Sequence, residues 1–407
     1  MDLSPWERTE TFVTRFPHSP SDAYDKPSLV NAVESEVLLS AIADVARLAG
    51  VSKSTASRAL SGNGYVSSAT RSRVQSAAAD IGYVPSSIAS SLATGLTRNV
   101  GVVIPFVNRW FFAEVLEGIE SALISAGYDL TLYRLHDDAA RRQHIFDYLL
   151  RRKRVDAVVV VGISLSPLEV RALSALGKPI VGIGGEIPEI STVSIDDASA
   201  SQFLTDHLVS LGHTRIMHLG GDQHEQMDFA VHSRRLAGFR RALATAGLSH
   251  PEDFRAVAYS IPGGYAGALA VLSDPSTRPT AIVAGCDEIA IGVILAARQL
   301  GITVPAQLSV VGIDGHSLAE LFGLTTLEQH PTEQGERAVQ LILDRLVPLI
   351  GSIPNEQITM PVDFIVRASS TAPPRIAGAS RIAGASRSAG PRFSASPRIS
   401  AVPLRRD

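Results

Sequence analysis

A cluster of short polar and basic side chains between residues 52 and 58 has the composition expected of a surface that contacts nucleic acid. If this stretch is a helix, Ala56, Ala59 and Leu60 fall on one buried face. The opposite face then carries Lys53, Ser54, Ser57 and Arg58. From the N-terminal part of a helix in the major groove, side chains as short as serine and as long as arginine reach base edges. The pattern therefore predicts a DNA-reading helix.

Two further helices are expected to position this one. The first has apolar residues at i, i+3, i+4 and i+7, namely Ile42, Val45, Ala46 and Ala49. Gly50 then provides a tight turn, Val51 plugs the core, and Ser52 caps the second helix. After a cap at Ser67 or Ser68, a third apolar stripe comprises Val74, Ala77, Ala78 and Ile81. This arrangement predicts a helix-turn-helix domain, and the alternative is a small helical subdomain whose basic residues form only a solvated face.

The 407 residues carry a net charge of −3, but the charge is unevenly distributed. Residues 1–38 hold three basic against seven acidic residues, whereas residues 39–100 hold six basic against two acidic residues. Residues 372–407 hold seven arginines against one aspartate, which leaves a net charge of −9 for residues 101–371. A compact basic segment ahead of a large acidic body is typical of a nucleic-acid reader attached to a domain with another task.

Both ends of the chain have compositions that do not favour a packed core. Residues 1–38 lack helical or strand periodicity, and residues 372–407 contain the repeat Arg-Ile-Ala-Gly-Ala-Ser twice, at 375–380 and 381–386. Sequence rich in Arg, Ser, Pro and Gly buries too little apolar area to offset chain entropy. We expect a disordered N-terminal extension and a disordered basic C-terminal tail, whose arginines could attract phosphates.

Between residues 99 and 371, short β-branched segments alternate with helical patterns. The expected strands are 100–104, 130–133, 157–161, 180–183, 216–219, 281–284 and 309–313. The expected helices are 113–126, 143–152, 199–211, 235–246, 264–272 and 288–300. This alternation predicts an α/β body of doubly wound parallel sheets with helices on both faces. A length of about 270 residues favours two lobes, with ligands bound between them beyond the carboxyl ends of the strands.

Catalytic and metal-binding motifs are not evident in the sequence. Residues 181–186 resemble part of a dinucleotide loop, but Ile187 replaces the third glycine and Pro188 interrupts a following helix. Three histidines lack metal-ligand spacing and are expected at the surface or at helix ends, namely His213, His218 and His224. The sequence thus predicts no enzyme activity, no cofactor and no metal.

The sequence also indicates a compartment. The single cysteine, Cys286, rules out an intramolecular disulfide and fits a reducing environment. The first forty residues contain no basic segment followed by an apolar one, and no apolar run approaches the roughly 18–20 residues that span a bilayer. We therefore expect a cytoplasmic protein without membrane contact.

The ordered string IADVARLAGVSKSTASRAL, from Ile42 to Leu60, closely resembles the helix-turn-helix of the lactose/galactose-repressor (LacI/GalR) family of bacterial transcription regulators. The likeness continues through residues 66–85, then through Ile88–Ala93, which is similar to the family's hinge helix, and on to about residue 370. The resemblance implies a homodimeric repressor that binds a pseudo-palindromic operator in double-stranded DNA at the bacterial nucleoid. It also implies a periplasmic-binding-protein-like body that holds a small effector, often a carbohydrate.

Carried over position by position, the resemblance implies two groups of DNA contacts on the helix-turn-helix. Lys53, Ser54 and Arg58 are similar to the family's base-reading residues. Contacts to phosphates, or positioning roles, are implied for Ser52, Thr55, Ser57, Asn63 and Tyr83. In the hinge, Ala89 and Leu92 are implied at the DNA, and Leu92 resembles the leucine that wedges into the minor groove. Because the hinge is short, it is expected to fold only with DNA and the partner subunit.

In the cleft, Arg235 and Asp314 match family positions that hold polar effector groups through charge-assisted hydrogen bonds. Phe112 and Tyr259 match aromatic positions that pack on a ring. Weaker candidates are Asp196, Asp287 and Gln329. Two alternatives stay open, because Asp287 could instead cap the helix that follows it and Arg235 could be a surface arginine at a helix start.

Two positions depart from the family's pattern. Cys286 occupies a position that often carries a polar amide in sugar-binding relatives, which leaves the identity of any sugar open. Asn108-Arg109-Trp110 replaces the usual Asn-Pro ahead of the paired aromatics, so the mouth of the cleft gains an aromatic ring and a cation. Trp110 either stacks on a ligand or packs at the edge of a lobe, and we favour packing.

These observations predict five segments. They are a disordered extension at 1–38, a helix-turn-helix domain at 39–85, a hinge helix and linker at 86–98, a two-lobed effector-binding and dimerisation domain at 99–371, and a disordered tail at 372–407. The alternative is a solute-binding protein without DNA regulation, which would have a similar two-lobed body. The missing signal segment and the basic helical domain both oppose this alternative.

Overall fold

The structure is a computed structural model that describes residues 42–62, 64–83, 96–135, 138–152, 155–187, 189–222, 230–346 and 354–374. The predicted N-terminal extension, most of the predicted hinge and nearly all of the predicted tail lie outside the described residues. The chain separates after Ser90 into two compact units. Among the helices described, none has both the length and the apolarity needed to cross a membrane.

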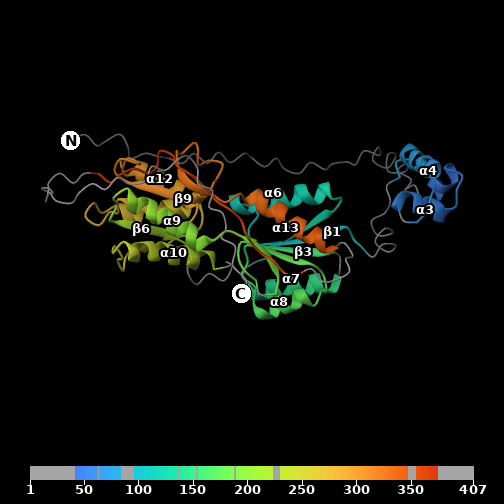
Figure 1. Ribbon diagram of the computed structural model, residues 1–407, viewed down its shortest axis with the longest axis horizontal. Coiled ribbons are helices and arrows are strands. Elements are labelled where there is room, and N and C mark those ends of the chain that lie inside the picture. The colour runs from blue at the N-terminus through green and yellow to red at the C-terminus, as the bar shows by residue number, and fades with distance from the viewer. Residues whose placement is uncertain are drawn as a thin grey trace, which may run out of the picture. The chain divides into compact units, whose positions relative to one another are not determined.

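The described part of the first unit contains three short helices (Figure 1), which are α2 (Ile42–Leu48), α3 (Lys53–Ser61) and α4 (Ser68–Asp80). Helix α3 begins at the predicted cap, because the Ser52 hydroxyl accepts a hydrogen bond from the Thr55 backbone N–H at 3.1 Å. The turn between α2 and α3 passes through Gly50, whose φ of 62° lies in the left-handed region that favours glycine. The predicted helix-turn-helix is therefore present.

Small apolar side chains fill the core of this unit. Val45, Ala56 and Val74 are fully buried, and each comes from a different helix. The Arg73 guanidinium on α4 donates a hydrogen bond from Nε to the Ala49 backbone carbonyl at 2.8 Å. This bond fastens α4 to the turn that directly follows α2.

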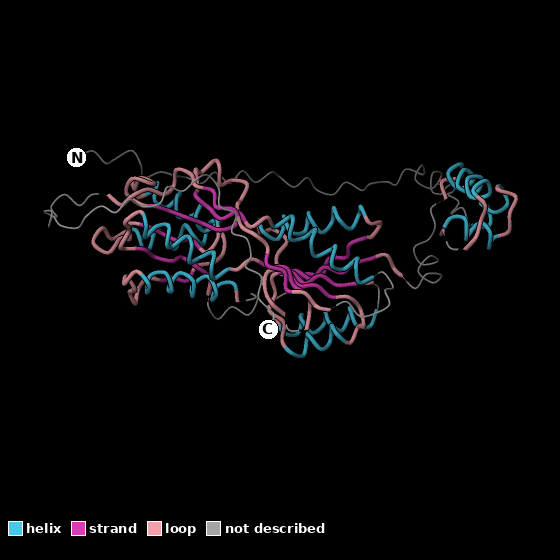
Figure 2. Tube along the Cα trace, in the orientation of Figure 1, coloured by secondary structure: helices cyan, strands magenta, loops and turns pink. Residues whose placement is uncertain are grey.

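The first lobe of the second unit contains a sheet of parallel strands in the order β11-β5-β4-β3-β1-β2. These strands are β1 (Asn99–Ile104), β2 (Asp129–Arg134), β3 (Ala157–Val161), β4 (Ile180–Ile183), β5 (Ser191–Ser194) and β11 (Gln357–Thr359). The helices that cover its two faces (Figures 1 and 2) are α6 (Trp110–Ser125) with α13 (Pro331–Leu346), and α7 (Ala139–Arg152) with α8 (Pro167–Ser174). Along β3, Val159 packs toward the first pair and Val158 toward the second, as alternation in a strand requires.

The second lobe contains a sheet in the order β12-β10-β9-β8-β6-β7. Its strands are β6 (Ile216–Gly220), β7 (Phe254–Ala256), β8 (Ala281–Ala284), β9 (Ser309–Asp314), β10 (Thr325–Glu328) and β12 (Asp363–Ile365). Helices α9 (Asp197–Ser210) and α10 (Val231–Thr245) pack on one face, and α11 (Ile261–Leu272) and α12 (Asp287–Gln299) on the other. The doubly wound two-lobed architecture expected from the sequence is thus confirmed.

One strand departs from the expected parallel arrangement. Strand β12 is antiparallel to β10, so the second sheet is mixed. The reason lies in β11, which runs parallel to the other strands of the first sheet. Its carboxyl end therefore faces the second lobe. Only three residues later the chain continues into the second sheet as β12, in the direction opposite to that sheet's other strands.

The chain passes between the lobes after β5, β10 and β11. Helix α13 follows β10 of the second lobe, yet it packs against α6 of the first. Glycine makes this packing possible, because a Cβ atom at Gly118 would lie 2.0 Å from the Thr332 carbonyl oxygen and one at Gly335 would lie 2.3 Å from the Val115 carbonyl oxygen. The close approach fixes the first turn of α13 at the junction of the lobes.

Two histidines expected at the surface or at helix ends are buried. His213 does follow the end of α9, where its backbone N–H donates to the Leu208 carbonyl at 3.2 Å, whereas His218 lies within β6, so for His218 the prediction was wrong. His213 contacts the Thr280 hydroxyl at 2.9 Å and the Thr371 carbonyl at 2.8 Å, and His218 stacks on Phe239 with ring centres 5.3 Å apart. Burial lowers the pKa of His213, and it lowers the pKa of His218 to about 4. Both are neutral core residues at pH 7, and the described residues include no metal-binding group of His, Cys, Asp and Glu; His224 lies outside them.

We expect Gly118→Ala to destabilise the two-lobed unit by about 1–3 kcal/mol, because the new methyl group must push α13 away from α6. This loss should outweigh the gain of about 1 kcal/mol that alanine brings to a helix interior. Thermal unfolding measures the effect, and Ser121→Ala, at an exposed position of the same helix, is the control. A melting temperature equal to that of the control would contradict the close packing of α6 on α13.

Candidate functional site

A cavity that is partly open to solvent lies between the two lobes, at the carboxyl ends of both sets of strands. Phe106 and Gly162 come directly after β1 and β3 of the first lobe. Cys286, Asp314 and Gln329 lie at the corresponding ends of β8, β9 and β10 in the second. Ligands of doubly wound folds bind at this edge of the sheet.

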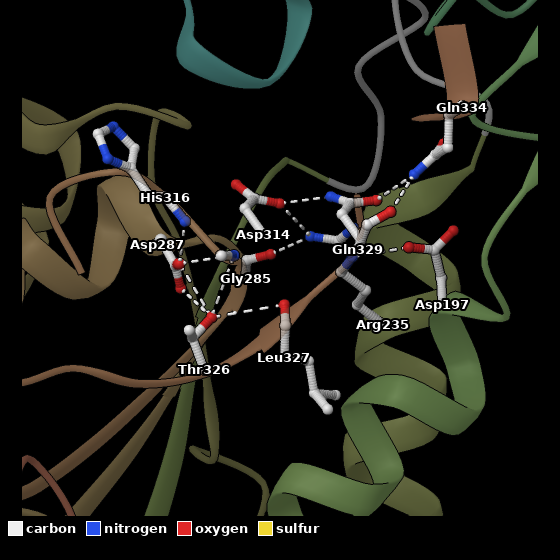
Figure 3. A network of polar contacts seen from close by, with 11 residues as sticks. Asp197, Arg235, Gly285, Asp287, Asp314, His316, Thr326, Leu327, Gln329 and Gln334 are labelled. Atoms are coloured by element: carbon white, nitrogen blue, oxygen red, sulfur yellow. Dashed lines mark hydrogen bonds and ion pairs between the residues drawn. The ribbon is translucent and has the colours of Figure 1, made fainter. Parts of the chain in front are cut away.

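The second lobe contributes a buried arginine to the cavity wall (Figure 3). Arg235, on α10, is 4% exposed, and its Nε donates a hydrogen bond to Asp197 Oδ1 at 2.8 Å. Its Nη1 donates to the Gly285 backbone carbonyl and lies 3.9 Å from Asp314 Oδ1. Burial acts to lower the pKa of the guanidinium, but the nearby Asp197, Tyr259 and Asp314 outweigh burial and raise it. A permanent cation with protein acceptors is therefore fixed in the wall.

Asp314 is held in an unusual position beside this arginine. Its φ of 142° lies in a region that L-residues rarely adopt, at a cost of about 1–3 kcal/mol. Its carboxylate accepts a hydrogen bond from Gln329 Nε2 at 2.6 Å, and the Gln329 backbone carbonyl accepts one from Gln334 Nε2 at 2.7 Å. Burial raises the pKa of Asp314 well above its ordinary value although the charge of Arg235 opposes the shift. The ionised carboxylate can accept an O–H or N–H group of a ligand, and the protonated form, which burial favours, can donate a hydrogen bond.

Aromatic rings from both lobes form the apolar walls. The Phe112 ring of α6 lies against Gly162, where a Cβ atom would approach Phe112 Cε1 to 2.5 Å, so a side chain at Gly162 would displace the ring. In the second lobe the Tyr259 ring packs on His232 with ring centres 4.1 Å apart. A flat or ring-shaped ligand can therefore contact a ring from each lobe.

The structure brings five of the seven predicted effector residues to the cavity, namely Phe112, Arg235, Tyr259, Asp314 and Gln329. It also excludes the alternative of a surface position for Arg235. Asp196 and Asp287 do not line the cavity. Asp196 instead caps α9, where its carboxylate accepts the Ser199 backbone N–H at 3.0 Å.

Asp287 has a structural role that differs from both of its predicted ones. It is the first residue of α12 and fully buried, while Cys286 occupies the cap position. Its carboxylate accepts hydrogen bonds from the Thr326 hydroxyl at 2.7 Å and from the backbone N–H groups of Gly315 and His316 at 3.0 and 2.9 Å. Burial raises the pKa of Asp287 to about 6 in spite of these bonds. The side chain fastens the turn that follows Asp314 (Figure 3).

Five polar or charged residues that line the cavity are missing from the predicted effector set, namely Arg109, Asp197, His232, Glu288 and Gln334. Asp197 and Glu288 directly follow predicted site residues, and Arg109 directly precedes Trp110. His232 and Gln334 lie near the starts of α10 and α13. An acidic pair at a helix start was the available signal for Asp197, because the first acid caps the helix and the second lies about 100° further around the axis. Trp110 packs at the lobe edge, as favoured, and stacks on His316 with ring centres 4.7 Å apart.

In the first unit, α3 exposes the predicted DNA-facing side chains, which are Lys53, Ser54, Ser57 and Arg58. Arg58 Nε donates a hydrogen bond to the Ser54 carbonyl at 3.1 Å. The hydroxyls of Ser52 and Thr55 are 2.9 Å apart at the start of the helix, and Tyr83 packs partly buried on the core. The remaining predicted DNA contacts lie outside the described residues, namely Asn63, Ala89 and Leu92.

Comparisons with known proteins agree with both halves of this architecture. Residues 41–86 match the family described as "Bacterial regulatory proteins, lacI family", and residues 205–370 match "Periplasmic binding protein-like domain". The transcriptional repressor PurR of Vibrio campbellii is 31% identical over 319 residues, which is 76% of this chain and 92% of that repressor. The ribose operon repressor of Escherichia coli is 30% identical over 320 residues, 74% of this chain and 92% of its own.

A solved complex of the transcriptional regulator CelR with cellobiose is also similar. Its TM-score is 0.60 at 26% sequence identity, and the match covers 81% of this chain and 99% of that one. A helix-turn-helix unit on the same chain as a two-lobed binding domain defines a DNA-binding transcription regulator that responds to a small molecule, and not an enzyme. The chain belongs to the lacI family of bacterial regulatory proteins.

Asp314→Asn should make the unliganded protein more stable, because burial disfavours the ionised carboxylate while the amide keeps an oxygen that can accept from Gln329. A raised folded-state pKa means that the wild type loses stability as the pH rises from the unfolded value through the folded one. The advantage of the variant should therefore be larger at about pH 8 than at about pH 5. Melting temperatures at the two pH values measure it.

The control for this prediction is Asp206→Asn, which removes a carboxylate from an exposed position on α9. Its melting temperature should stay close to that of the wild type at both pH values. A stability advantage of Asp314→Asn that vanishes at pH 8, or that is larger at pH 5, would contradict the unfavourable burial of this charge.

Proposed function

We propose that this protein is a dimeric transcriptional repressor whose affinity for a pseudo-palindromic operator is controlled by a carbohydrate, or a derivative of one, bound between its lobes. The observation that carries the proposal is the buried Arg235 beside Asp314 in an aromatic-walled cavity. A guanidinium offers donors and a carboxylate offers acceptors, and sugar hydroxyls need both. The protein would act in the bacterial cytoplasm, at the nucleoid.

On the DNA side, we propose that α3 enters the major groove with Lys53, Ser54 and Arg58 at the base edges. Their exposure, and the cap that fixes the start of α3, support this role. Contacts to phosphates, or positioning roles, are proposed for Ser52, Thr55, Ser57, Asn63 and Tyr83. For the hinge helix and linker at 86–98, minor-groove contacts are proposed at Ala89 and Leu92.

Arg58→Ala should weaken binding to the operator by about 1–3 kcal/mol per half-site, because a base-specific contact is lost. Binding to random DNA should change little, since phosphate contacts dominate it. Fluorescence anisotropy with both DNAs at one salt concentration measures the difference. Arg298→Ala, at an exposed position in the other unit, is the control for the loss of one positive charge. An equal loss of affinity on both DNAs would contradict a base-reading role for Arg58.

Control by an effector requires that the ligand bind differently to two arrangements of the lobes. Gln334 belongs to α13, which packs on the first lobe, and it donates to the carbonyl of Gln329 at the end of β10 in the second. Arg235, Asp314, Gln329 and Gln334 therefore connect the two lobes through the cavity wall. A ligand that bonds Asp314 would change this connection, and the segment 86–98 is proposed to transmit the change by ordering or melting at the operator.

In a thermal-shift panel of sugars, sugar derivatives and nucleobases, at least one sugar or sugar derivative should raise the melting temperature. A hundredfold excess of ligand over its Kd corresponds to about 2.7 kcal/mol of stabilisation. The same compound should change operator affinity. Asp314→Asn should lose the shift and Asp206→Asn should keep it. Tight operator binding with no response to any sugar would contradict carbohydrate control and leave DNA binding intact.

A further inference from the structure

Charged side chains in the cavity wall are not balanced. Three carboxylates, from Asp197, Asp314 and Glu288, share the lining with the guanidinium groups of Arg235 and Arg109. The buried cation is already neutralised, because Arg235 bonds Asp197 at 2.8 Å and lies 3.9 Å from Asp314. An anionic group on a ligand would therefore gain little from Arg235 and would meet the carboxylate of Glu288.

Glu288 is the carboxylate of this set that a ligand can reach without displacing a protein partner. It lies in the first turn of α12, half-buried, and lines the cavity. Within the described part of the chain its carboxylate makes no hydrogen bond and no ion pair, in contrast to Asp197 and Asp314. Burial raises the pKa of Glu288, and the charge of Arg109 opposes the shift. A half-buried acceptor of this kind is stabilised by a donor that the ligand brings.

Arg109 is the second cation of the cavity, and it comes from the first lobe. Its side chain is half-buried, like that of Glu288, and its guanidinium carbon lies 3.6 Å from the centre of the Phe106 ring. In the described structure it forms no ion pair with Glu288, although its charge influences that carboxylate. Because water still reaches part of this guanidinium, and because it packs on the Phe106 ring, Arg109 offsets only part of the negative charge of Glu288.

We propose that Glu288 determines the class of effector: the cavity takes an uncharged ring compound that presents an O–H or N–H donor to this carboxylate, and it rejects the phosphate ester of the same compound. The proposal deepens the proposed function, since it concerns the same cavity. A donor facing Glu288 makes a charge-assisted hydrogen bond. A phosphate carries a charge of about −1.5 to −2 at pH 7, and the carboxylate would repel it in a partly desolvated site.

The test compares matched pairs of ligands on the full-length dimer by isothermal calorimetry. The pairs are ribose and ribose 5-phosphate, glucose and glucose 6-phosphate, and adenosine and its 5′-monophosphate. In the wild type, at least one uncharged member should bind, and at least tenfold more tightly than its phosphate ester. Glu288→Gln should weaken that uncharged ligand by about five- to tenfold, because a charged acceptor becomes a neutral one. The preference over the phosphate ester should shrink at least tenfold.

Glu320→Gln is the matched control, because Glu320 is exposed on the second lobe and does not line the cavity. It should leave both affinities unchanged. Tighter binding of a phosphate ester by the wild type would overturn the proposal, and loss of that binding in Arg109→Ala would identify Arg109 as an anion anchor. Binding unaffected by Glu288→Gln, or no binding by any uncharged member, would also overturn it. Operator affinity of the unliganded wild type, measured in parallel, reports separately on the proposed DNA regulation.

Discussion

The cavity depends on one buried charge, the guanidinium of Arg235. Removing an arginine from water costs several kcal/mol, and a buried cation is tolerated only where carboxylates and carbonyls surround it. Asp197 on α9 and the Gly285 carbonyl after β8 provide these acceptors, so three separate segments are held together around one side chain. Removing either acceptor would leave an uncompensated charge in the wall. The geometry of the second lobe at the cleft is therefore fixed by the need to satisfy this guanidinium.

The first lobe positions its side of the cavity through close packing of two helix backbones. Gly118 and Gly335 bring α6 and α13 so close that a methyl group would collide with a carbonyl on either side. Because α13 cannot move independently of α6, Gln334 in its first turns holds a fixed place beside Gln329. The polar contacts that begin at Arg235 thus end on a helix that belongs to the rigid core of the other lobe. A change of hydrogen bonding at Asp314 is in a position to alter the angle between two well-packed bodies.

Most of this architecture could be predicted from the sequence, because a strand or helix that is buried must have apolar residues at the positions that face the core. The run Ala157–Val161 must be a central strand, since five consecutive buried apolar residues fit between two helical layers. Strand β5 has the sequence Ser-Thr-Val-Ser, and its polar side chains are buried by pairing with residues far along the chain, as when Glu356 donates its backbone N–H to the Ser191 hydroxyl at 3.0 Å. Nothing local in the sequence signals that pairing. The same limit explains why His213 and His218 were expected at the surface.

At two acidic pairs the predicted site residue was displaced by one position, and that displacement mattered. The acidic pair Asp196 and Asp197 begins α9, and a shift of one position decides which acid caps the helix and which reaches Arg235. Asp287 and Glu288 begin α12 in the same way, with one acid buried beneath the turn after β9 and the other at the cavity. In both pairs the first acid accepts hydrogen bonds from backbone N–H groups, and the second acid lines the cavity.

The two pairs differ in whether the second acid has a protein partner, and this difference determines which acid can bind a ligand. Asp197 forms an ion pair with Arg235 and is therefore not available to a ligand. In the described structure Glu288 has no such partner. A ligand that lacks a donor for Glu288 leaves a half-buried acceptor unpaired. The resulting loss of affinity is larger than the loss caused by a missing apolar contact. The aromatic walls can therefore admit many rings, while the second acid of α12 decides among them.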